Sequence, residues 1–552
     1  MQPWTKVVDP FGNIWLSALV AALPIFVLGY LLAVRKMKGY LAALITIVIA
    51  TLIGIFMYGI PYNNSVGAVL AMDFLGAFKG LFPIFYVVLF GVFLYNLTVE
   101  AGQFEIIKWS IGKVSDDQRI QAILIAFCFS AFIEGAAGFG TPVAIAAAMM
   151  IGMGFPPVYA AGLALVANSV PVAYGSIGIP ITTAGSVTGL DPNLIGAMAG
   201  RQLPILTLIV PLWVVMIMGG WKAAKGVLPA AIVAGVSFAA AQFISSNYFS
   251  YQITDLAASF SSIIAMAILL VFWKPKDKWT FEGAQVQLAS DKKYTAGQVA
   301  VAWSPYVITM IVIFIWSEKW FKDLFPASKA GQAAPWYEIK FAVPGLYAKT
   351  GDTVSNVVHS INWFTASGTA ILVATLLSAL VLIAFANFSF ARYLKTFGNT
   401  CKQLALPALS VACFLAYAEL STRTGMGETL GKALSSTGVL FAFFAPIIGF
   451  IGVFLTGSDT STNALFGKLQ QVAAKEVGIS DILAVSSNST GGCAAKMISP
   501  QSIAVGAGAT NQAGQEGNIL RFTFKHSLIF VGLMGVISWL QAYVFPWMVP
   551  TP

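Results

Sequence analysis

The chain has 552 residues, of which 58% are hydrophobic and only 10% are charged, and its formal net charge is +9. A soluble protein carries about 25% charged residues, so this composition leaves no room for a soluble domain and predicts an all-α polytopic membrane protein. Because a spanning helix needs about 20 residues, the length accommodates about 12 to 14 membrane segments. The basic residues lie in loops between apolar runs, where membrane orientation accounts for them without nucleic acid as a partner.

Apolar runs long enough to cross a bilayer follow one another along the chain. They cover residues 14–34, 40–60, 81–97, 226–244, 257–273, 300–316, 363–385, 404–418, 440–455 and 527–548. Cytoplasmic loops are enriched in Lys and Arg, so the basic loop after the first run places the N-terminus outside. Arg521 and Lys525 likewise place the C-terminus outside. The same rule predicts a cytoplasmic loop at 274–299 and an extracytoplasmic loop at 317–360.

Glycine- and hydroxyl-rich segments interrupt two of the apolar stretches, at 132–142 and at 454–463. Each of them begins with Phe-x-x-Gly. Non-helical backbone at membrane depth leaves polar groups unpaired unless protein or a water-filled cavity surrounds it. Broken or re-entrant helices of this kind are typical of a transport pathway.

The landmarks of the first break recur in the same order around the second. Phe132 and Asn168 match Phe454 and Asn488 at nearly equal separations, which indicates an internal repeat. Loop charges give the two copies opposite orientations, so inverted-topology repeats are expected. The predicted divisions are N-terminal membrane helices at 1–65, a first inverted repeat at 66–220, connecting helices at 221–387, and a second inverted repeat at 388–552.

Proline positions predict where the broken helices restart. Proline is favoured at the first residue of a helix, and Pro142, Pro180 and Pro500 follow short polar or glycine-rich turns. Thr141 and Ser499 are suitable N-caps. Free backbone donors at such helix ends, with the positive end of the helix dipole, favour a carboxylate. The alternative is that the glycines in these turns only permit close helix packing.

Several of these segments resemble the bacterial L-lactate permease family. The similar runs are Glu134-Gly-Ala-Ala-Gly-Phe-Gly140, Gly200-Arg-Gln-Leu-Pro204, the segment 455–466, and Lys496-Met-Ile-Ser-Pro-Gln-Ser-Ile-Ala504. The resemblance implies a secondary active transporter of the bacterial inner membrane, surrounded by lipid, that takes up lactate, and often glycolate, with protons. It also implies membership of a wider ion transporter superfamily with inverted, broken-helix folds.

Two carboxyl groups are candidates for proton coupling. Ionisable groups inside a membrane are functional candidates by default. Glu134 lies in the first break among apolar neighbours, where desolvation suits a carboxyl to exchange protons; a purely structural carboxyl is the alternative. Asp459 lies in the second break and is either a partner or second proton site, or the N-cap of a helix that begins near Ala464.

The candidate substrate contacts surround the same two breaks. Lys496 is expected to pair with the substrate carboxylate or with Asp459, unless it extends to the membrane interface. The remaining candidates are Gly138, Gly140, Thr141, Asn168, Ser169, Ser458, Thr460, Asn463, Asn488, Ser499, Gln501 and Ser502. Arg201 and His526 form a second tier, because a topology anchor is at least as good an interpretation of Arg201, and helix-end histidines are more often surface features.

Alternatives remain at this stage. The pairs Asn168-Ser169 and Asn488-Ser489 resemble hairpin tips of sodium-coupled dicarboxylate carriers, although Ala167 and Val170 depart from that pattern. A sodium-coupled or broader carboxylate carrier and a small-anion channel therefore stay open, as do a monomer and a homodimer. No HExxH or GxSxG motif is present to indicate an enzyme. The cysteines show no CxxC spacing, so no metal site or cofactor is expected.

Overall fold

A computed structural model describes residues 3–112, 114–138, 140–281, 293–328, 332–350 and 353–551. Twelve helical stretches within these residues are long and apolar enough to cross a membrane, or up to 13 when a pair bent by 66° counts as one span. The prediction of an all-α polytopic protein with about 12 to 14 segments is confirmed. Residues 282–292 of the predicted cytoplasmic loop lie outside the described part of the chain.

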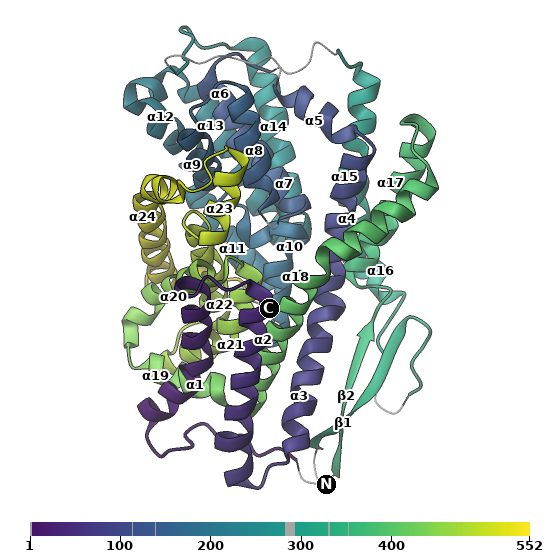
Figure 1. Cartoon of the computed structure of the whole chain (residues 1–552), viewed down its shortest axis with the longest axis vertical. Helices are drawn as coiled ribbons and strands as arrows, with labels where there is room; N and C mark the ends of the chain where they lie inside the picture. Colours follow the sequence, from purple (N-terminus) through teal and green to yellow (C-terminus); the bar gives the residue numbers. More distant parts are fainter. Residues whose placement is uncertain are drawn as a thin grey trace.

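The first half of the chain forms helices that the polar breaks divide into short pieces (Figure 1). They are α1 (Ile14–Gly29), α2 (Gly39–Ile53), α3 (Val66–Lys79), α4 (Tyr86–Glu100), α5 (Gln103–Gly112), α6 (Gln118–Ala122), α7 (Ser130–Ala136), α8 (Thr141–Gly152), α9 (Pro157–Ala167), α10 (Gly175–Thr188), α11 (Pro192–Thr207), α12 (Val210–Gly226), α13 (Leu228–Ile244) and α14 (Thr254–Phe272).

The second half contains longer helices and one small β-hairpin. Its elements are α15 (Ala296–Ser317), α16 (Lys319–Asp323), β1 (Glu338–Thr350), β2 (Thr353–Asn362), α17 (Ser367–Phe385), α18 (Phe390–Thr424), α19 (Met426–Ser435), α20 (Phe441–Thr456), α21 (Asp459–Val477), α22 (Asp481–Ala495), α23 (Pro500–Ala509) and α24 (Glu516–Tyr543). The strands pair antiparallel, with Glu338 opposite Asn362, and the register shifts between Ala342 and Tyr347. The hairpin lies in the predicted loop 317–360, except that β2 continues to Asn362, and it packs beside α3 (Figure 1).

Two spans that the apolar runs did not predict are Gln118–Ala136 and Pro192–Gly226. The first is entirely buried inside the protein, whereas the N-terminal span Ile14–Leu32 is only 28% buried. A helix enclosed by protein can carry polar groups such as Gln118 and Glu134, because it never faces lipid. Hydropathy alone therefore underestimates it.

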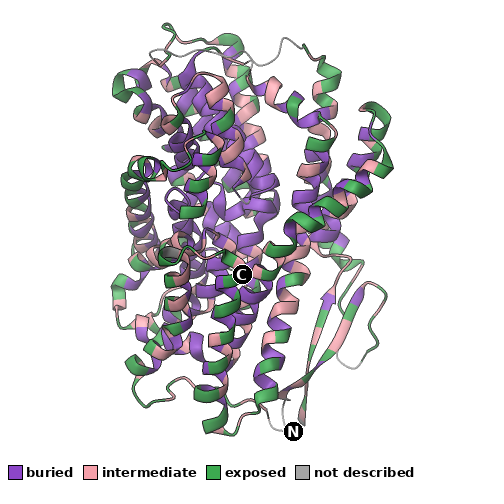
Figure 2. Ribbon diagram, in the orientation of Figure 1, coloured by how far each residue is buried: buried purple, intermediate pink, exposed green. Residues whose placement is uncertain are grey.

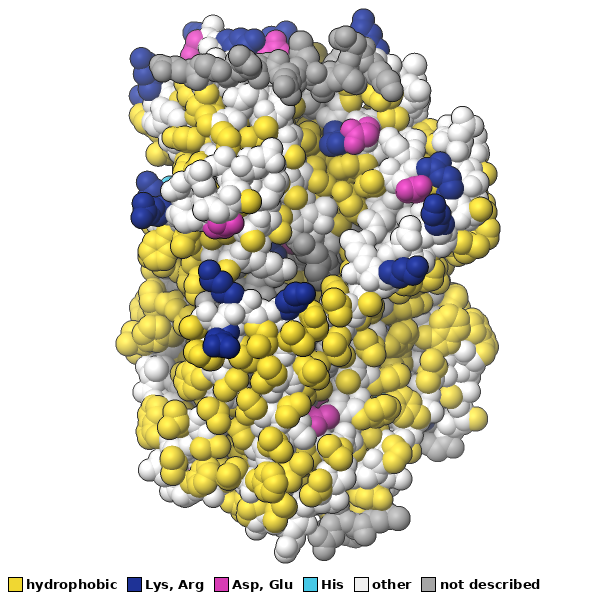
Figure 3. All heavy atoms as spheres, viewed as in Figure 1, with side chains coloured by type: hydrophobic (Ala, Val, Ile, Leu, Met, Phe, Trp, Pro, Cys, Tyr) yellow, Lys and Arg dark blue, Asp and Glu magenta, His cyan; other side chains and the backbone are white. Residues whose placement is uncertain are grey.

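Exposed apolar side chains cover the outside of the bundle. Figure 3 shows hydrophobic side chains over much of the visible face, with Lys and Arg gathered in separate patches. Leu19, Phe26 and Phe74 are examples, each more than half exposed. An apolar surface of this extent is unfavourable in water but matches the hydrocarbon core of a bilayer.

The buried apolar side chains form two large clusters. One gathers residues of α5 to α9 and α11 to α14 with parts of α22 to α24, and the other gathers α1 to α4, α15, α17 to α19 and part of α21. Helix α10 contributes to both, through Ile181 and through Ile177. Figure 2 shows this buried material running through the centre of the molecule. The broken helix α10 therefore lies where the two clusters meet.

Candidate functional site

A cavity of about 60 Å³ lies between the two breaks. Its ionisable lining residues are Glu134 from the first break, Asp459 from the second, and Lys496 from the end of α22. The other residues that line it are Gly140, Val172, Gly175, Ser176, Ile179, Pro180, Gly457, Ser458, Thr460, Gln501, Ser502 and Val505. The two breaks, more than three hundred residues apart in the sequence, thus share one polar cavity.

At the first break, α7 ends at Ala136 and the chain passes through left-handed backbone at Gly138 (φ +60°) and Gly140 (φ +84°) before α8 begins. A side chain strains such backbone, so glycine is favoured at both positions. Helix α8 starts at Thr141 and is preceded by Gly140, so Thr141 is the first helical residue rather than the predicted N-cap. Pro142 stands in the first turn, as predicted.

Glu134 is held by a chain of buried polar groups. Asn168 Nδ2 donates to Glu134 Oε2 at 2.9 Å, and Asn168 Oδ1 accepts from Ser130 Oγ at 2.7 Å. Both Glu134 and Asn168 are almost completely buried. A Cβ on Gly175 would lie 2.6 Å from Glu134 Oε1, so the absence of a side chain there leaves room for the carboxyl. Asn168 therefore contacts the carboxyl directly and does not line the cavity.

At the second break, α20 ends at Thr456 and Gly457 adopts left-handed backbone with φ +70°. Helix α21 begins at Asp459, and Ser458 is its N-cap through a hydrogen bond from the Ser461 amide at 3.2 Å. The interpretation of Asp459 as the cap of a helix that begins near Ala464 is wrong, because Ser458 has that function. Asp459 is free for another role.

The Asp459 carboxyl is only half satisfied. Its Oδ2 accepts a short hydrogen bond from Ser489 Oγ, while its buried Oδ1 has no partner among the described residues. Lys496 is buried, with 6% of its surface exposed, and its Nζ donates to the Gly457 carbonyl at 3.4 Å. Within the described ranges, no carboxylate forms an ion pair with Lys496 at or below 4.0 Å. A buried cation in this state is suited to receive an anion.

Asparagines connect the two breaks behind the cavity. Asn463 Nδ2 donates to the Pro180 carbonyl and to Ser489 Oγ, both at 3.1 Å. Asn488 Nδ2 donates to Asn463 Oδ1 at 2.9 Å. Three left-handed residues, Ser176 to Gly178, precede Pro180, so a helix restarts there as predicted. Asn463 and Asn488 hold this turn rather than line the cavity.

Two further predicted residues, Ser499 and Ser169, form hydrogen bonds within their own segments. Ser499 caps α23 as predicted, because its Oγ accepts from the Ser502 amide at 3.3 Å. Ser169 Oγ donates to the Val166 carbonyl at 2.7 Å, and Ser169 is not among the residues that line the cavity.

The second-tier residues lie outside this cavity. Arg201 donates to Asn247 Oδ1 at 2.8 Å and to the Met548 carbonyl at 2.9 Å, and so fastens the C-terminal segment. His526 Nδ1 accepts from Trp213 Nε1 at 3.1 Å. Neither residue belongs to the cavity lining.

Asp255 is a candidate that the sequence analysis missed. It lies in the first turn of α14, is only 1% exposed, and neither carboxyl oxygen has a hydrogen-bond partner in the described part of the protein. Its Cβ would lie 2.7 Å from a Cβ on Gly135, next to Glu134. An ionised carboxylate without a partner is costly at such a place, so Asp255 is suited to carry a proton. The signal was a lone carboxyl at the start of an apolar run.

Twelve candidate spans that enclose a polar cavity between interrupted helices define a multi-pass membrane permease. Comparison with known proteins agrees. The chain belongs to the L-lactate permease family, whose model matches residues 17–545. It is a multi-pass protein of the bacterial inner membrane, as predicted.

Relatives match the whole chain. The chain is 46% identical over 562 residues to an L-lactate permease of Salmonella typhimurium, which covers 100% of both proteins. It is 44% identical to the glycolate permease GlcA of Escherichia coli, with 99% of each chain covered. It is 42% identical to an L-lactate permease of Bacillus subtilis, covering 99% of this chain and 100% of the relative. The predicted family is confirmed.

Two solved transporters share the fold at low sequence identity. The Alcanivorax borkumensis YdaH transporter superposes with a TM-score of 0.52 at 11% identity, covering 93% of this chain and 100% of that one. Neisseria gonorrhoeae MtrF, titled as one of a class of antimetabolite efflux pumps, gives a TM-score of 0.50 at 12% identity, with 94% and 97% covered. These similarities concern the fold alone, and the inverted orientation of the repeats stays a prediction.

Proposed function

We propose that this protein takes up L-lactate, and also D-lactate and glycolate, together with protons, and that substrate and proton share the cavity between the breaks. The relatives named as L-lactate and glycolate permeases support the substrate class. One observation supports the coupling most directly: two carboxyls and one lysine line the same buried cavity. The proposal keeps the predicted roles of Glu134, Asp459 and Lys496, and it adds Asp255 as a further residue that carries a proton.

Charge balance explains how a proton would promote binding of a monocarboxylate. With Glu134 and Asp459 ionised and Lys496 charged, the lining carries one surplus negative charge and repels an anion. Protonation of one carboxyl cancels that surplus, and protonation of both leaves Lys496 as the only charge. Because electrostatic interactions are strong in a buried site, the protonated state binds the anion better. Proton and substrate then bind together.

The polar lining accounts for selection of a 2-hydroxy acid. Lys496 takes the carboxylate. Ser458, Thr460, Gln501 and Ser502 line the same cavity, and we expect their hydroxyl or amide groups to bond the 2-hydroxyl. The cavity volume of about 60 Å³ favours a small solute over a larger dicarboxylate. A single lysine also suits a single carboxylate.

The alternative of sodium coupling has less support from the geometry. Asn168 bonds Glu134 and Ser130, and Asn488 bonds Asn463, so these two amides serve the protein's own polar network. A small-anion channel is the other alternative, and concentrative uptake distinguishes a carrier from it.

Labelled L-lactate uptake into proteoliposomes tests the proposal. An inward proton gradient is compared with an inward sodium gradient, for the wild type and for Glu134→Gln. We expect concentrative uptake with protons, and loss of that concentration with retained counterflow exchange in Glu134→Gln. Glu105→Gln, an exposed carboxyl paired with Lys108 at the surface, is the matched control. Sodium-driven uptake, or unchanged coupling in Glu134→Gln, would contradict the proposal.

A further inference from the structure

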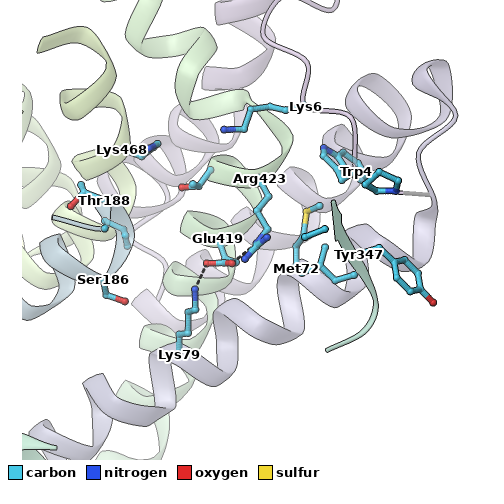
Figure 4. Close-up of a pocket in the computed structure, with 16 residues that line it drawn as sticks. Trp4, Lys6, Met72, Lys79, Ser186, Thr188, Tyr347, Glu419, Arg423 and Lys468 are labelled. Carbon is cyan, nitrogen blue, oxygen red and sulfur yellow. Dashed lines mark hydrogen bonds and ion pairs between the residues drawn. The ribbon is translucent and has the colours of Figure 1, made fainter. Parts of the chain in front are cut away.

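A second, larger cavity lies away from the breaks, and we call it the outer basin (Figure 4). Its volume is about 660 Å³, and its charged lining residues are Lys6, Lys79, Arg423, Lys468 and Glu419. The N-terminal segment, α3, α18, α21, the end of α10 and β1 all contribute to it. Because its wall includes the N-terminal segment, the predicted topology places it on the extracytoplasmic side.

The outer basin carries surplus positive charge. Among the described residues, Glu419 is the one carboxylate that lines it, and it pairs with both Lys79, at 2.8 Å, and Arg423. Lys6 pairs with Glu428 at 2.6 Å, outside the lining. Lys468 Nζ donates to the neutral amide oxygen of Gln471 at 2.8 Å. Lys468 is therefore a half-buried cation that forms no ion pair at or below 4.0 Å within the described residues.

The same two helices form walls of the outer basin and of the central cavity. Pro180, near the break in α10, lines the central cavity, while residues Ser186 to Gly189 at the end of that helix line the basin. Asp459 at the start of α21 lines the central cavity, and Lys468 lines the basin. A rise of 1.5 Å per residue separates these two residues by about 14 Å along the helix axis. The two cavities are neighbours along one wall.

We propose that the outer basin is a second anion site, which captures a small 2-hydroxymonocarboxylate before it enters the central cavity. This inference rests on the proposed function. A cleft lined by charge of one sign focuses the electric field and raises the local concentration of counter-ions. Lys468 binds the carboxylate, and Lys79 and Arg423, which share one carboxylate, strengthen the positive field.

Kinetics of L-lactate uptake in vesicles of neutral phosphatidylcholine test the basin. In Lys468→Gln we expect the KM for uptake from outside to rise roughly three- to tenfold, with an unchanged maximal rate. Raising the salt concentration screens exposed charge, so it should raise the wild-type KM more than that of Lys468→Gln, in which the field comes from Lys79 and Arg423 alone. Lys468→Arg should restore the wild-type KM. Counterflow at saturating lactate, retained in Lys468→Gln, shows that the variant folds.

Lys475→Gln is the matched control, since Lys475 lies on the same helix, is 63% exposed and pairs with Asp481 outside the basin. If the KM of Lys468→Gln equals that of Lys475→Gln, the proposal that the outer basin binds the substrate is wrong. A rise in the KM of Lys468→Gln that occurs only with anionic lipid would also contradict the proposal, because the ligand of the basin would then be a lipid headgroup. Absence of lactate uptake in the wild type would instead overturn the proposed function, which separates the two failures.

Discussion

At the first break the carboxyl of Glu134 accepts a hydrogen bond from an amide, whereas at the second break the carboxyl of Asp459 accepts one from a hydroxyl and lies near a lysine. The backbone plans are alike: a helix ends, left-handed glycine follows, and a new helix begins. The charges differ, because the cation among the described lining residues, Lys496, lies on the side of the second break. The two breaks therefore have similar backbone but different side chains, and the proposed function places the binding of the anion at the lysine beside the second break.

The strongest way to break this comparison is to remove the cation. Lys496→Gln should lower the apparent affinity for L-lactate at least about 30-fold, because truncating one partner of a buried charge pair costs about 2–5 kcal/mol. Equilibrium binding of labelled lactate to purified protein measures this. Lys496→Arg should recover part of the loss, and Lys475→Gln should bind normally. Near-normal lactate affinity in Lys496→Gln would refute the assignment of anion binding to the second break.

The proton assignment depends on Asp255 as well as Glu134. Asp255→Asn keeps the shape of the protonated acid but cannot release a proton, so a carrier that needs it should equilibrate lactate to an inside-to-outside ratio of about 1. Proteoliposomes with an inward proton gradient measure that ratio. Exchange of internal for external lactate should persist, which shows that the fold is intact. Full accumulation of lactate would remove Asp255 from the proton path.

Filling the space beside the Glu134 carboxyl should give a smaller effect. Gly175→Ala would bring a Cβ to 2.6 Å from Glu134 Oε1, and overpacking of this kind costs about 1–3 kcal/mol. Thermal unfolding in detergent and proton-driven uptake should both decline. Gly508→Ala, in a helix with open space around the glycine, should leave both unchanged. Equal behaviour of the two variants would mean that Glu134 moves away without loss.

The smallest effect belongs to a residue outside both breaks. Arg201→Gln should leave the KM for lactate within about twofold of the wild type, because the substitution removes no side chain that binds the substrate. It should lower the unfolding temperature, since the guanidinium fastens Asn247 and the Met548 carbonyl. A large increase in KM would place Arg201 on the substrate path, contrary to its position.

The sequence analysis anticipated the backbone of the site better than its side-chain contacts. The positions where helices restart were predicted correctly from Pro142, Pro180 and Pro500, because proline and left-handed glycine act through local backbone preferences. Asn168 and Asn488 were expected to contact the substrate, but they bond Glu134 and Asn463. Which polar group faces a cavity depends on the helices packed behind it, and no local pattern encodes that.

Composition and periodicity determined that this protein is a helical bundle in a membrane, since lipid leaves the backbone few other ways to pair its polar groups. Local residue preferences determined where its helices break, and the motifs around the breaks identified the family. Only the tertiary structure decided that Glu134 and Asp459 share a cavity, that Asp255 lies beside Glu134, and that Lys468 forms no ion pair with a described carboxylate. These facts arise from contacts between distant segments, whose geometry is set by packing of the whole bundle.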